Sequence, residues 1–455
     1  MALTFGNTSK LFIGKQSAPL VKTPWADYSN KVYQFASGGL GVTGDYTTPD
    51  VNTGTNAPIV PILGQLGTEG SLTLPLDTKG MGLWLEQLML ATPATVEVLA
   101  TPYELRAATD FNDGTAITNF TANMQPKDHL PGLPDSQAGV NCGRIIFAFE
   151  STVRAESDGG QIVVRGYDQG LVRPLIETIS VTDTAAIGNK TTTNAFAEVT
   201  SVTLTGFQTT GEVTITVDPA IYKHTFEVGD ALTNGLTVEM VKGTVPSTYQ
   251  DVHVSEGTIT VGDTNETDLT FLGGQAYQNE NADGGSAASP ETGKTRQPGQ
   301  ASPGWSAVAR FDDRIVEIGE GSVSINHSLG RNENSFARQV YLPLPVITGK
   351  REVTLSTRVS YPMTDMSGND FDIVSYAYGR NMAISLEVAS MRAGALHNSL
   401  RVELPSAQLT TFPDPADIGQ GQINLSLDFT AFSSEGNTDL RIIAINEETQ
   451  AQFIS

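Results

Sequence analysis

Alternating apolar and polar residues recur through most of the chain, and two distant stretches repeat the same order. Residues 71–76 alternate and run into 79–85. Residues 353–361 alternate in the same way and lead into 371–376. Because successive side chains of a strand point to opposite faces, each alternating stretch predicts a strand with one buried face. A repeated β-module is typical of a chain that builds a larger symmetric surface and not of one that builds a single active site.

The same alternation predicts many further short strands separated by turn residues. One helix is predicted over 81–90, with Leu83, Trp84, Leu88 and Leu90 available for its apolar face and Pro93 as its stop. Residues 45–56 consist of turn formers and predict an exposed loop. The other predicted strands are 11–13, 31–35, 145–149, 161–165, 176–181, 202–204, 212–217, 224–228, 236–240, 257–261, 269–272, 322–327, 400–404, 421–429 and 440–445.

The order of these elements predicts five segments. Residues 1–92 and 220–272 are the two parts of a first β-sandwich domain, interrupted by an inserted β-sandwich over 93–219, and 305–455 form a second, tandem β-sandwich domain. Residues 273–304 are rich in Gly, Ser, Gln and Pro without apolar anchors, which predicts a linker or a loop that becomes ordered on assembly. The predicted fold class is all-β, mainly antiparallel, with one or two short helices.

Composition agrees with this picture and limits the partners. A chain of 455 residues with 39% hydrophobic and 17% charged residues is long enough for two to four folded domains and is not disordered. With 50 acidic against 27 basic residues the net charge is −23, so the chain lacks the clustered Lys and Arg that grip phosphates and should repel polyanions. Acidity kept simply for solubility explains the same numbers.

Targeting and redox signals are few. Residues 1–8 lack the basic start and apolar run of a signal peptide, and no stretch approaches the ~20 apolar residues of a membrane span. These features predict a soluble protein made in a cytoplasm, without a membrane partner. The single cysteine, Cys142, lies near Ile145 and Ile146 and predicts a buried, inert thiol.

No pattern in the chain predicts catalysis, a cofactor or a metal ion. Residues 39–44 (GLGVTG) match a dinucleotide-binding motif in letters, but no helix start follows the glycines to meet a pyrophosphate. The acidic stretches 263–268 and 365–372 lack the spacing of calcium loops and favour turns. The five histidines are scattered singly, and His224 and His253 are expected to be wall residues of strands; the others are His129, His327 and His397.

The order of strands and turns resembles the tail tube (major tail) proteins of long-tailed bacteriophages. The segments that carry this resemblance are 65–90, 222–226, 235–240 and 252–261 in the first half, and 321–326, 400–407 and 419–427 in the second. The stretches 162–168, 177–179 and 195–202 resemble the Ig-like domains that phage tail proteins carry on their outside. Two tube domains in one chain depart from the commoner single-domain form, whose subunits make rings of six.

The resemblance implies a structural virion protein and not an enzyme. Three chains with two tube domains each would close a homotrimeric, pseudo-hexameric ring, and stacked rings would form the tail tube. Its partners would be further copies of itself, the tape measure protein, the tail terminator and the tail-tip proteins, with DNA passing through the lumen without specific binding. The protein would be assembled in the host bacterial cytoplasm and belong to the virion tail.

Two other readings remain open from the residues. One is a virion- or cell-surface adhesin or decoration protein that binds carbohydrate or protein through residues 93–219. The other is a secreted β-rich hydrolase, which the lack of a recognisable catalytic constellation disfavours. Deleting the insert separates the first from a tube subunit, whose assembly should survive the deletion.

Overall fold

The structure is a computed structural model of the chain, and its described residues form antiparallel β-sheets with two short α-helices. It describes residues 10–19, 21–33, 35, 37–47, 62–76, 80–97, 103–111, 113–121, 124–126, 143–150, 153–156, 159–167, 174–182, 187–207, 211–218, 222–262, 265–292, 294–297, 307–312, 314–316, 318–331, 345–361, 379–389, 399–411, 423–433, 438–446 and 448–454. The helices are α1 (Gly82–Met89) and α3 (Gln450–Phe453), with a short 3-10 turn, η2 (Trp25–Asp27). The prediction of an all-β fold with one or two short helices is confirmed.

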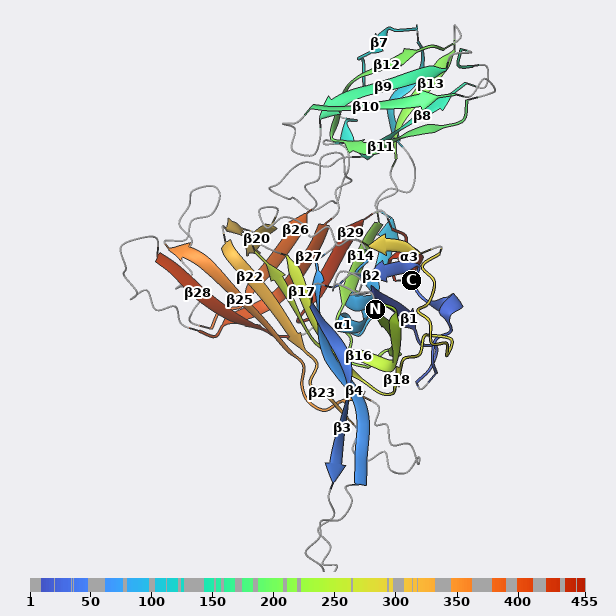
Figure 1. The fold of residues 1–455 in the computed structure, drawn as a ribbon. Coiled ribbons are helices and arrows are strands. Elements are labelled where there is room, and N and C mark those ends of the chain that lie inside the picture. The colour runs from blue at the N-terminus through green and yellow to red at the C-terminus, as the bar shows by residue number, and fades with distance from the viewer. Residues whose placement is uncertain are drawn as a thin grey trace, which may run out of the picture.

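The strands outside the insert fall into two sets and a few connecting strands (Figure 1). The first set is β1 (Lys10–Lys15), β2 (Lys31–Tyr33), β3 (Ser37–Thr47), β4 (Ile62–Pro75), β15 (Leu236–Lys242), β16 (Val245–Val261), β17 (Glu266–Gly273) and β18 (Ala276–Gln278). The second set is β20 (Ala307–Phe311), β21 (Arg314–Val316), β22 (Ile318–Asn326), β25 (Glu352–Tyr361), β26 (Met382–Ala389), β27 (Ser399–Leu409), β28 (Ile423–Ala431) and β29 (Arg441–Asn446). The connecting strands are β5 (Ala94–Glu97), β14 (Tyr222–Glu227), β19 (Thr295–Gln297), β23 (Leu329–Arg331) and β24 (Pro345–Ile347).

The two sets have the same pairing pattern. In the first set the ladders are β2·β1, β1·β15, β15·β16, β16·β18, β16·β17, β17·β4 and β4·β3. In the second they are β21·β20, β20·β26, β26·β27, β27·β29, β27·β28, β28·β25 and β25·β22, in the same order along the chain. Strands β4 and β25, which contain the two repeated sequence stretches, therefore occupy the same place in their sets.

One long strand in each set passes from an outer to an inner sheet through a bulge. Strand β16 pairs with β15 in its first half and with β17 in its second, and its register shifts between the pairs of Leu236 and Val238. Strand β27 shifts in the same way between the pairs of Met382 and Ile384. Asp251, at the first bulge, has a φ of 53°, a left-handed backbone that a bulge accommodates. The bulges turn each set into two facing sheets.

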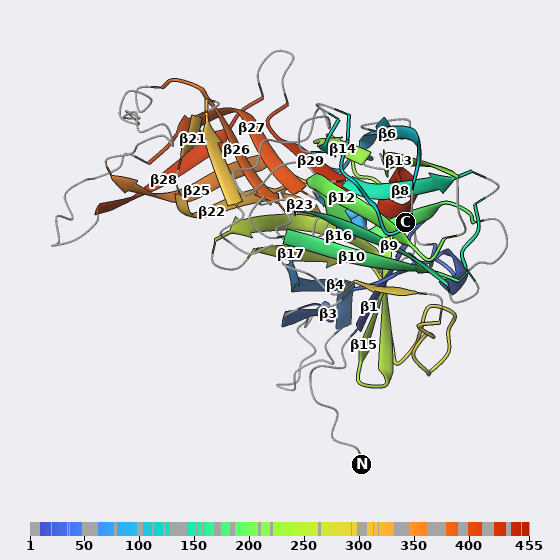
Figure 2. The same ribbon diagram turned by 90° about the horizontal axis from the view of Figure 1, so that it is seen from above.

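The two sets are joined into one body. Six residues of β16, Glu256–Val261, pair antiparallel with β22, so the inner sheet runs β3, β4, β17, β16, β22, β25, β28 across both sets. Figure 2 shows β16 and β17 between β4 and β22. Strand β14 also pairs with β29, and buried apolar residues of both sets form a single cluster that includes Leu11 and Phe429.

The inserted strands form a separate sandwich with its own core. One sheet has the order β10 (Pro174–Val181), β9 (Gly160–Tyr167), β12 (Glu198–Thr205), β7 (Ala116–Ile117). The other has the order β11 (Lys190–Phe196), β8 (Gly143–Phe149), β13 (Glu212–Asp218), β6 (Tyr103–Asp110). Their buried apolar residues, such as Phe147 and Val164, form a cluster of their own, and Figure 1 shows these strands standing apart from the rest. Strand β5, within the predicted insert, pairs instead with β14 of the main body.

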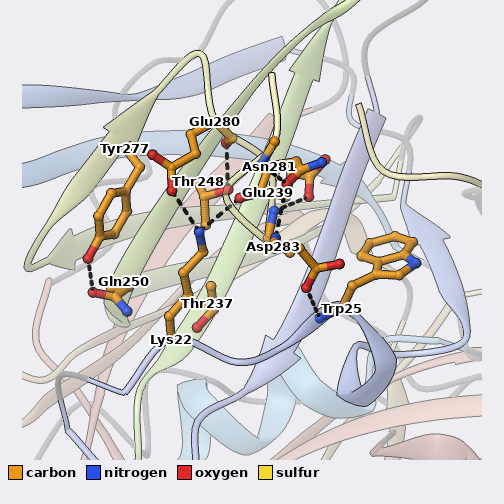
Figure 3. Close-up of polar contacts among 12 residues, drawn as sticks. Lys22, Trp25, Thr237, Glu239, Thr248, Gln250, Tyr277, Glu280, Asn281 and Asp283 are labelled. Atoms are coloured by element: carbon orange, nitrogen blue, oxygen red, sulfur yellow. Dashed lines mark hydrogen bonds and ion pairs between the residues drawn. The ribbon is translucent and has the colours of Figure 1, made fainter. Parts of the chain in front are cut away.

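Residues 273–304 are tied to the first set more closely than their sequence indicated. Figure 3 shows the turn around Asn281 held against β15 by Glu239, whose carboxylate accepts hydrogen bonds from the Ala282 and Ser289 amides. Ala282 is 3% exposed and packs with Phe12 and Val241. The expectation that this segment lacks apolar anchors is therefore wrong for its described part, because small alanine side chains fit against the sheet.

Other sequence predictions have mixed outcomes. The helix over 81–90 is confirmed as α1. The predicted loop over 45–56 is wrong at its start, because β3 continues through Thr47 in a ladder with β4, and its residues 48–56 lie outside the described part. Strands β6 and β11 were not predicted. Residues 371–376, Cys142, His129 and His397 lie outside the described residues.

Candidate functional site

The broad feature that needs a function is the polar face of the inner sheet. Rows of directly paired residues cross it, and one row contains hydroxyl groups on nearly every strand. That row consists of Ser37, Thr73, Asp268, Thr258, Ser324, Thr354 and Thr430, each paired with the next across a ladder. Because residues directly opposite each other point to one side of a sheet, this row defines a polar face that continues from the first set into the second.

The polar side chains on this face bond to one another across strands. The Thr73 hydroxyl accepts from Ser37 at 3.1 Å and donates to Asp268 Oδ1 at 2.6 Å. In the second set, Ser356 donates to Asp428 Oδ1 at 2.7 Å. The Thr258 hydroxyl donates to Ser324 at 3.3 Å, directly across the junction between the two sets. The face is thus a connected polar surface, because hydroxyl and carboxylate groups satisfy each other along it.

The charge on this face is strongly acidic. Among the described residues of the seven strands, one cation faces this side, Arg358, which lies opposite Glu320 and Ser426 in the ladders. Arg331 of β23 adds a second cation, which forms a 2.8 Å ion pair with Glu69. The acidic residues with the same alternation are Glu69, Glu256, Glu266, Asp268, Glu320, Glu352 and Asp428. A surface of this sign repels phosphate groups, because the potentials of neighbouring like charges add.

The opposite face of the same sheet is apolar and packs into the core. Leu72, Leu269 and Ile259 on the first set are each 1% exposed, and so are Val323 and Leu355 on the second. Helix α1 covers this side: Trp84 lies 5.5 Å from Phe271 and 5.8 Å from Tyr33 between ring centroids. The sharp difference between the two faces fixes which side is available to a partner or a solvent channel.

The glycine motif of residues 39–44 does not form a nucleotide site in the structure. It lies within strand β3, which pairs with β4 along its length. The described residues that directly follow the glycines, up to Thr47, continue as strand β3, so no helix amides face a pyrophosphate there. Asn265, in the described end of the acidic stretch 263–268, accepts from the Gly262 amide and serves a turn between β16 and β17.

The three described histidines are structural. His224 on β14 and His253 on β16 are buried wall residues of strands, as expected. His224 bonds Thr95 through Nδ1 at 2.9 Å and stacks on Phe453 at 4.2 Å, which holds the C-terminal helix. Burial lowers the pKa of His253 to about 4 and also lowers the pKa of His224 and of His327. All three are therefore neutral at pH 7.

His327 and Arg351 tie the two sets together beside α1. His327 Nε2 lies 2.5 Å from the Leu88 carbonyl oxygen, and its backbone amide donates to Ser255 at 3.0 Å. The Arg351 guanidinium forms two 2.9 Å bonds to the Asp439 carboxylate and one to the Gly229 carbonyl. These contacts join parts that are far apart in the sequence, and no local pattern could have indicated them.

The described residues contain no group of three or more His, Cys, Asp or Glu side chains placed to hold a metal ion. Nor does any helix among them have the length and apolar character needed to cross a bilayer.

Comparison with known proteins agrees with the fold. No curated protein matches the chain. The family model described as "Phage tail tube protein" matches residues 6–431, which is nearly the whole chain and includes the insert and every strand of the two sets except β29. The chain therefore belongs to the phage tail tube protein family.

Proposed function

We propose that three copies of this chain close a ring, that the polar face of the inner sheet lines its bore, and that stacked rings form the channel for DNA ejection. The observation that supports this is the β16·β22 ladder, which joins two sets of strands with the same topology into one sheet. A chain with two such units needs only three copies to present six around an axis. Membership of the family accounts for the structural role and the self-assembly into a tube.

The acidic, hydroxyl-rich face suits a channel through which DNA must slide. Protein groups that bind the DNA backbone are mainly Lys and Arg, and each one adds affinity that would slow passage. Seven acids stand against two cations on this face, Arg358 and Arg331, of which Arg331 forms a 2.8 Å ion pair with Glu69, so the wall keeps a net negative charge that holds phosphates at a distance. The partners in this proposal are other copies of the chain, the tape measure protein, the tail terminator and the tail-tip proteins, in a tail that is assembled in the host cytoplasm.

The insert is proposed to be an outward Ig-like decoration domain. The insert has a core of its own. The strands that lead into and out of the insert, β5 and β14, lie side by side. The insert should therefore fold without the tube strands. Replacing residues 98–221 by a short Gly-Ser linker should leave assembly intact. Loss of assembly on this deletion would favour the alternative in which the insert carries the main function of an adhesin.

Negative-stain microscopy and mass measurement of the assembled protein test the ring. Three chains per ring are expected, and six chains per ring would contradict the proposal.

The bore is tested by Glu320→Lys with Glu352→Lys, both exposed on the polar face. Tubes of this variant should retain short double-stranded DNA in a salt-dependent way, whereas the unaltered tubes should not.

A matched control places the same charge change elsewhere. Glu156→Lys with Glu212→Lys changes the charge by the same amount at two exposed positions of the insert and should not cause DNA retention inside the tubes. Equal DNA retention by both variants would show that the polar face does not line the bore, even if the rings form as expected.

A further inference from the structure

A groove on the polar face lies between strand β23 and the strands β4 and β17. Arg331 of β23 forms a 2.8 Å ion pair with Glu69 of β4 and donates to the Thr43 hydroxyl at 2.8 Å, which places β23 beside β4 (Figure 1). The groove has a volume of about 510 Å³, and its lining includes Glu69, Ser71, Ser255, Thr270, Leu272 and Leu329. A volume of this size accommodates a ligand or several side chains of a partner.

Two leucines make part of this groove apolar. Leu272 lies on β17, where the alternation places Glu266, Asp268 and Thr270 on the same face. Leu329 lies on β23, and both leucine side chains are partly exposed. Apolar side chains on a face that meets water gain free energy when a partner covers them, so this part of the groove favours a contact with another molecule.

The second set of strands provides an internal comparison for this place. Strands β16 and β27 have bulges at corresponding positions, and counting from the bulges Val254 corresponds to Leu409. The residues paired with these two, in β17 and β28, are both phenylalanines. The residues that follow the two phenylalanines are Leu272 and Thr430, so Thr430 has the place of Leu272 in the second set.

The second set has a hydrogen-bonded polar surface at the place of Thr430. The Asp428 carboxylate accepts from the Ser356 hydroxyl at 2.7 Å and from the Thr411 hydroxyl at 2.9 Å. The Asp428 carbonyl oxygen accepts from the Thr410 hydroxyl at 2.9 Å. Because corresponding strands form there without a leucine, the fold does not require Leu272, which favours a role for this residue in binding.

The rim of the groove is acidic. Glu256 lies directly opposite Thr270 in the β16·β17 ladder and forms no ion pair among the described residues. Glu69, on the other side of the groove, is 46% exposed and is paired with Arg331. A rim of this sign repels a phosphate backbone and attracts a Lys or Arg side chain. The groove therefore fits a protein segment that has an apolar side chain next to a cation, and it does not fit DNA.

We propose that this groove binds a partner protein inside the bore. An apolar side chain of the partner packs against Leu272 and Leu329, and a neighbouring Lys or Arg of the partner pairs with Glu256. Each chain has one such groove, so a ring of three chains has three. The location in the bore rests on the proposed function, whereas the groove itself is formed within a single chain.

Binding of a labelled amphipathic peptide of leucine and lysine to the unassembled chain, measured by fluorescence anisotropy, tests the groove. Leu272→Thr introduces the residue found at this place in the second set and should weaken binding by about 10-fold to 100-fold, because the burial of a leucine side chain is lost. The matched control combines Leu272→Thr with Thr430→Leu, which keeps composition and charge and moves the leucine to the second set. This exchange variant should bind as weakly as Leu272→Thr.

A second peptide, in which serine replaces leucine, isolates the electrostatic part of binding. It should bind the unaltered chain and both variants equally, because the net charge is the same in all three. Equal binding of the leucine peptide by the exchange variant and the unaltered chain would show general adhesion to an acidic surface and would overturn the groove as a binding site.

Methyl NMR spectra of the unaltered chain guard against variants that fail to fold. The leucine peptide should shift the methyl signals of Leu272 and Leu329 and leave those of Leu204, in the core of the insert, unchanged. Unchanged signals of Leu272 and Leu329 would overturn the proposal. Assembled tubes should bind the peptide as well; tubes that exclude it would show that a neighbouring copy fills the groove, which overturns the proposal although rings form. Absence of any ring or tube would instead refute the proposed function.

Discussion

Replacing Glu239 by glutamine should release residues 282–289 from strand β15. The carboxylate of Glu239 is fully buried on β15. Its Oε2 accepts from the Ala282 amide at 2.9 Å and from the Ser289 hydroxyl at 2.7 Å, and its Oε1 accepts from the Ser289 amide at 3.0 Å. Glutamine keeps one acceptor oxygen but places an NH₂ group where the other oxygen was, so that at least one donor faces a donor.

The expected cost follows from the number and kind of these bonds. A hydrogen bond to a charged group contributes about 1.5–3 kcal/mol, and a buried donor left without an acceptor costs about 1–3 kcal/mol. Losing one bond and weakening the others should therefore cost about 3 kcal/mol. Because each 1.4 kcal/mol is about tenfold in an equilibrium constant, the segment should open about 100-fold more often in Glu239→Gln.

Hydrogen exchange at the Ala282 and Ser289 amides measures this opening directly. The matched control is Glu280→Gln in the same turn, where the carboxylate is 36% exposed and forms one 3.1 Å ion pair with Lys22. An exposed pair contributes at most about 1 kcal/mol, so the control should change exchange by less than about tenfold. Equal effects of the two variants, or free-chain exchange of both amides in the unaltered protein, would refute the reasoning.

Three further outcomes are expected. The folded-state pKa of His253 is about 4, below its unfolded value, so its contribution to stability is complete above pH 6.5 and falls as the pH drops. About 2 kcal/mol of the free energy of unfolding should be lost between pH 7 and pH 5. Urea unfolding of His253→Gln should lack this part of the loss. Gly82→Ala should destabilise the protein by about 1–3 kcal/mol, although alanine has the better helix propensity, because the new methyl group would meet the Phe453 carbonyl. The control is Gly41→Ala, whose methyl group would point into open space, and it should show no such loss in thermal unfolding. Arg351→Met should destabilise the protein by about 2–3 kcal/mol, because it leaves the Asp439 carboxylate buried without its guanidinium. The more exposed Arg441 pairs with Glu227 and Glu403, and Arg441→Met should cost about 1 kcal/mol or less. Equal losses in urea unfolding would contradict the difference in burial.

Local periodicity was sufficient for many elements of this fold. The alternation in residues 71–76 and 353–361 predicted strands that the structure contains as parts of β4 and β25. The apolar face of Leu83, Trp84 and Leu88 predicted helix α1. These predictions succeeded because the side-chain direction along a strand or helix depends only on nearby residues.

Local patterns failed where a strand is interrupted or a contact is distant. Residues 257–261 alone were predicted as a strand, but β16 begins at Val245, because a bulge at Asp251 breaks the alternation without ending the strand. The segment after Gly273 looked like a linker, because the carboxylate that holds Ala282 and Ser289 is on Glu239, far back in the sequence.

By itself the sequence determined that the chain is built of strands with one polar and one apolar face, and that one β-module occurs twice. The tertiary structure alone decided that these faces align, because the Thr258–Ser324 pair and the acidic rows depend on the register of the ladder between β16 and β22. That register is set by burying Ile259 against Val323 and Ile325 in a core that both halves share. Periodicity fixes which way a side chain points, whereas long-range packing chooses the strand beside it.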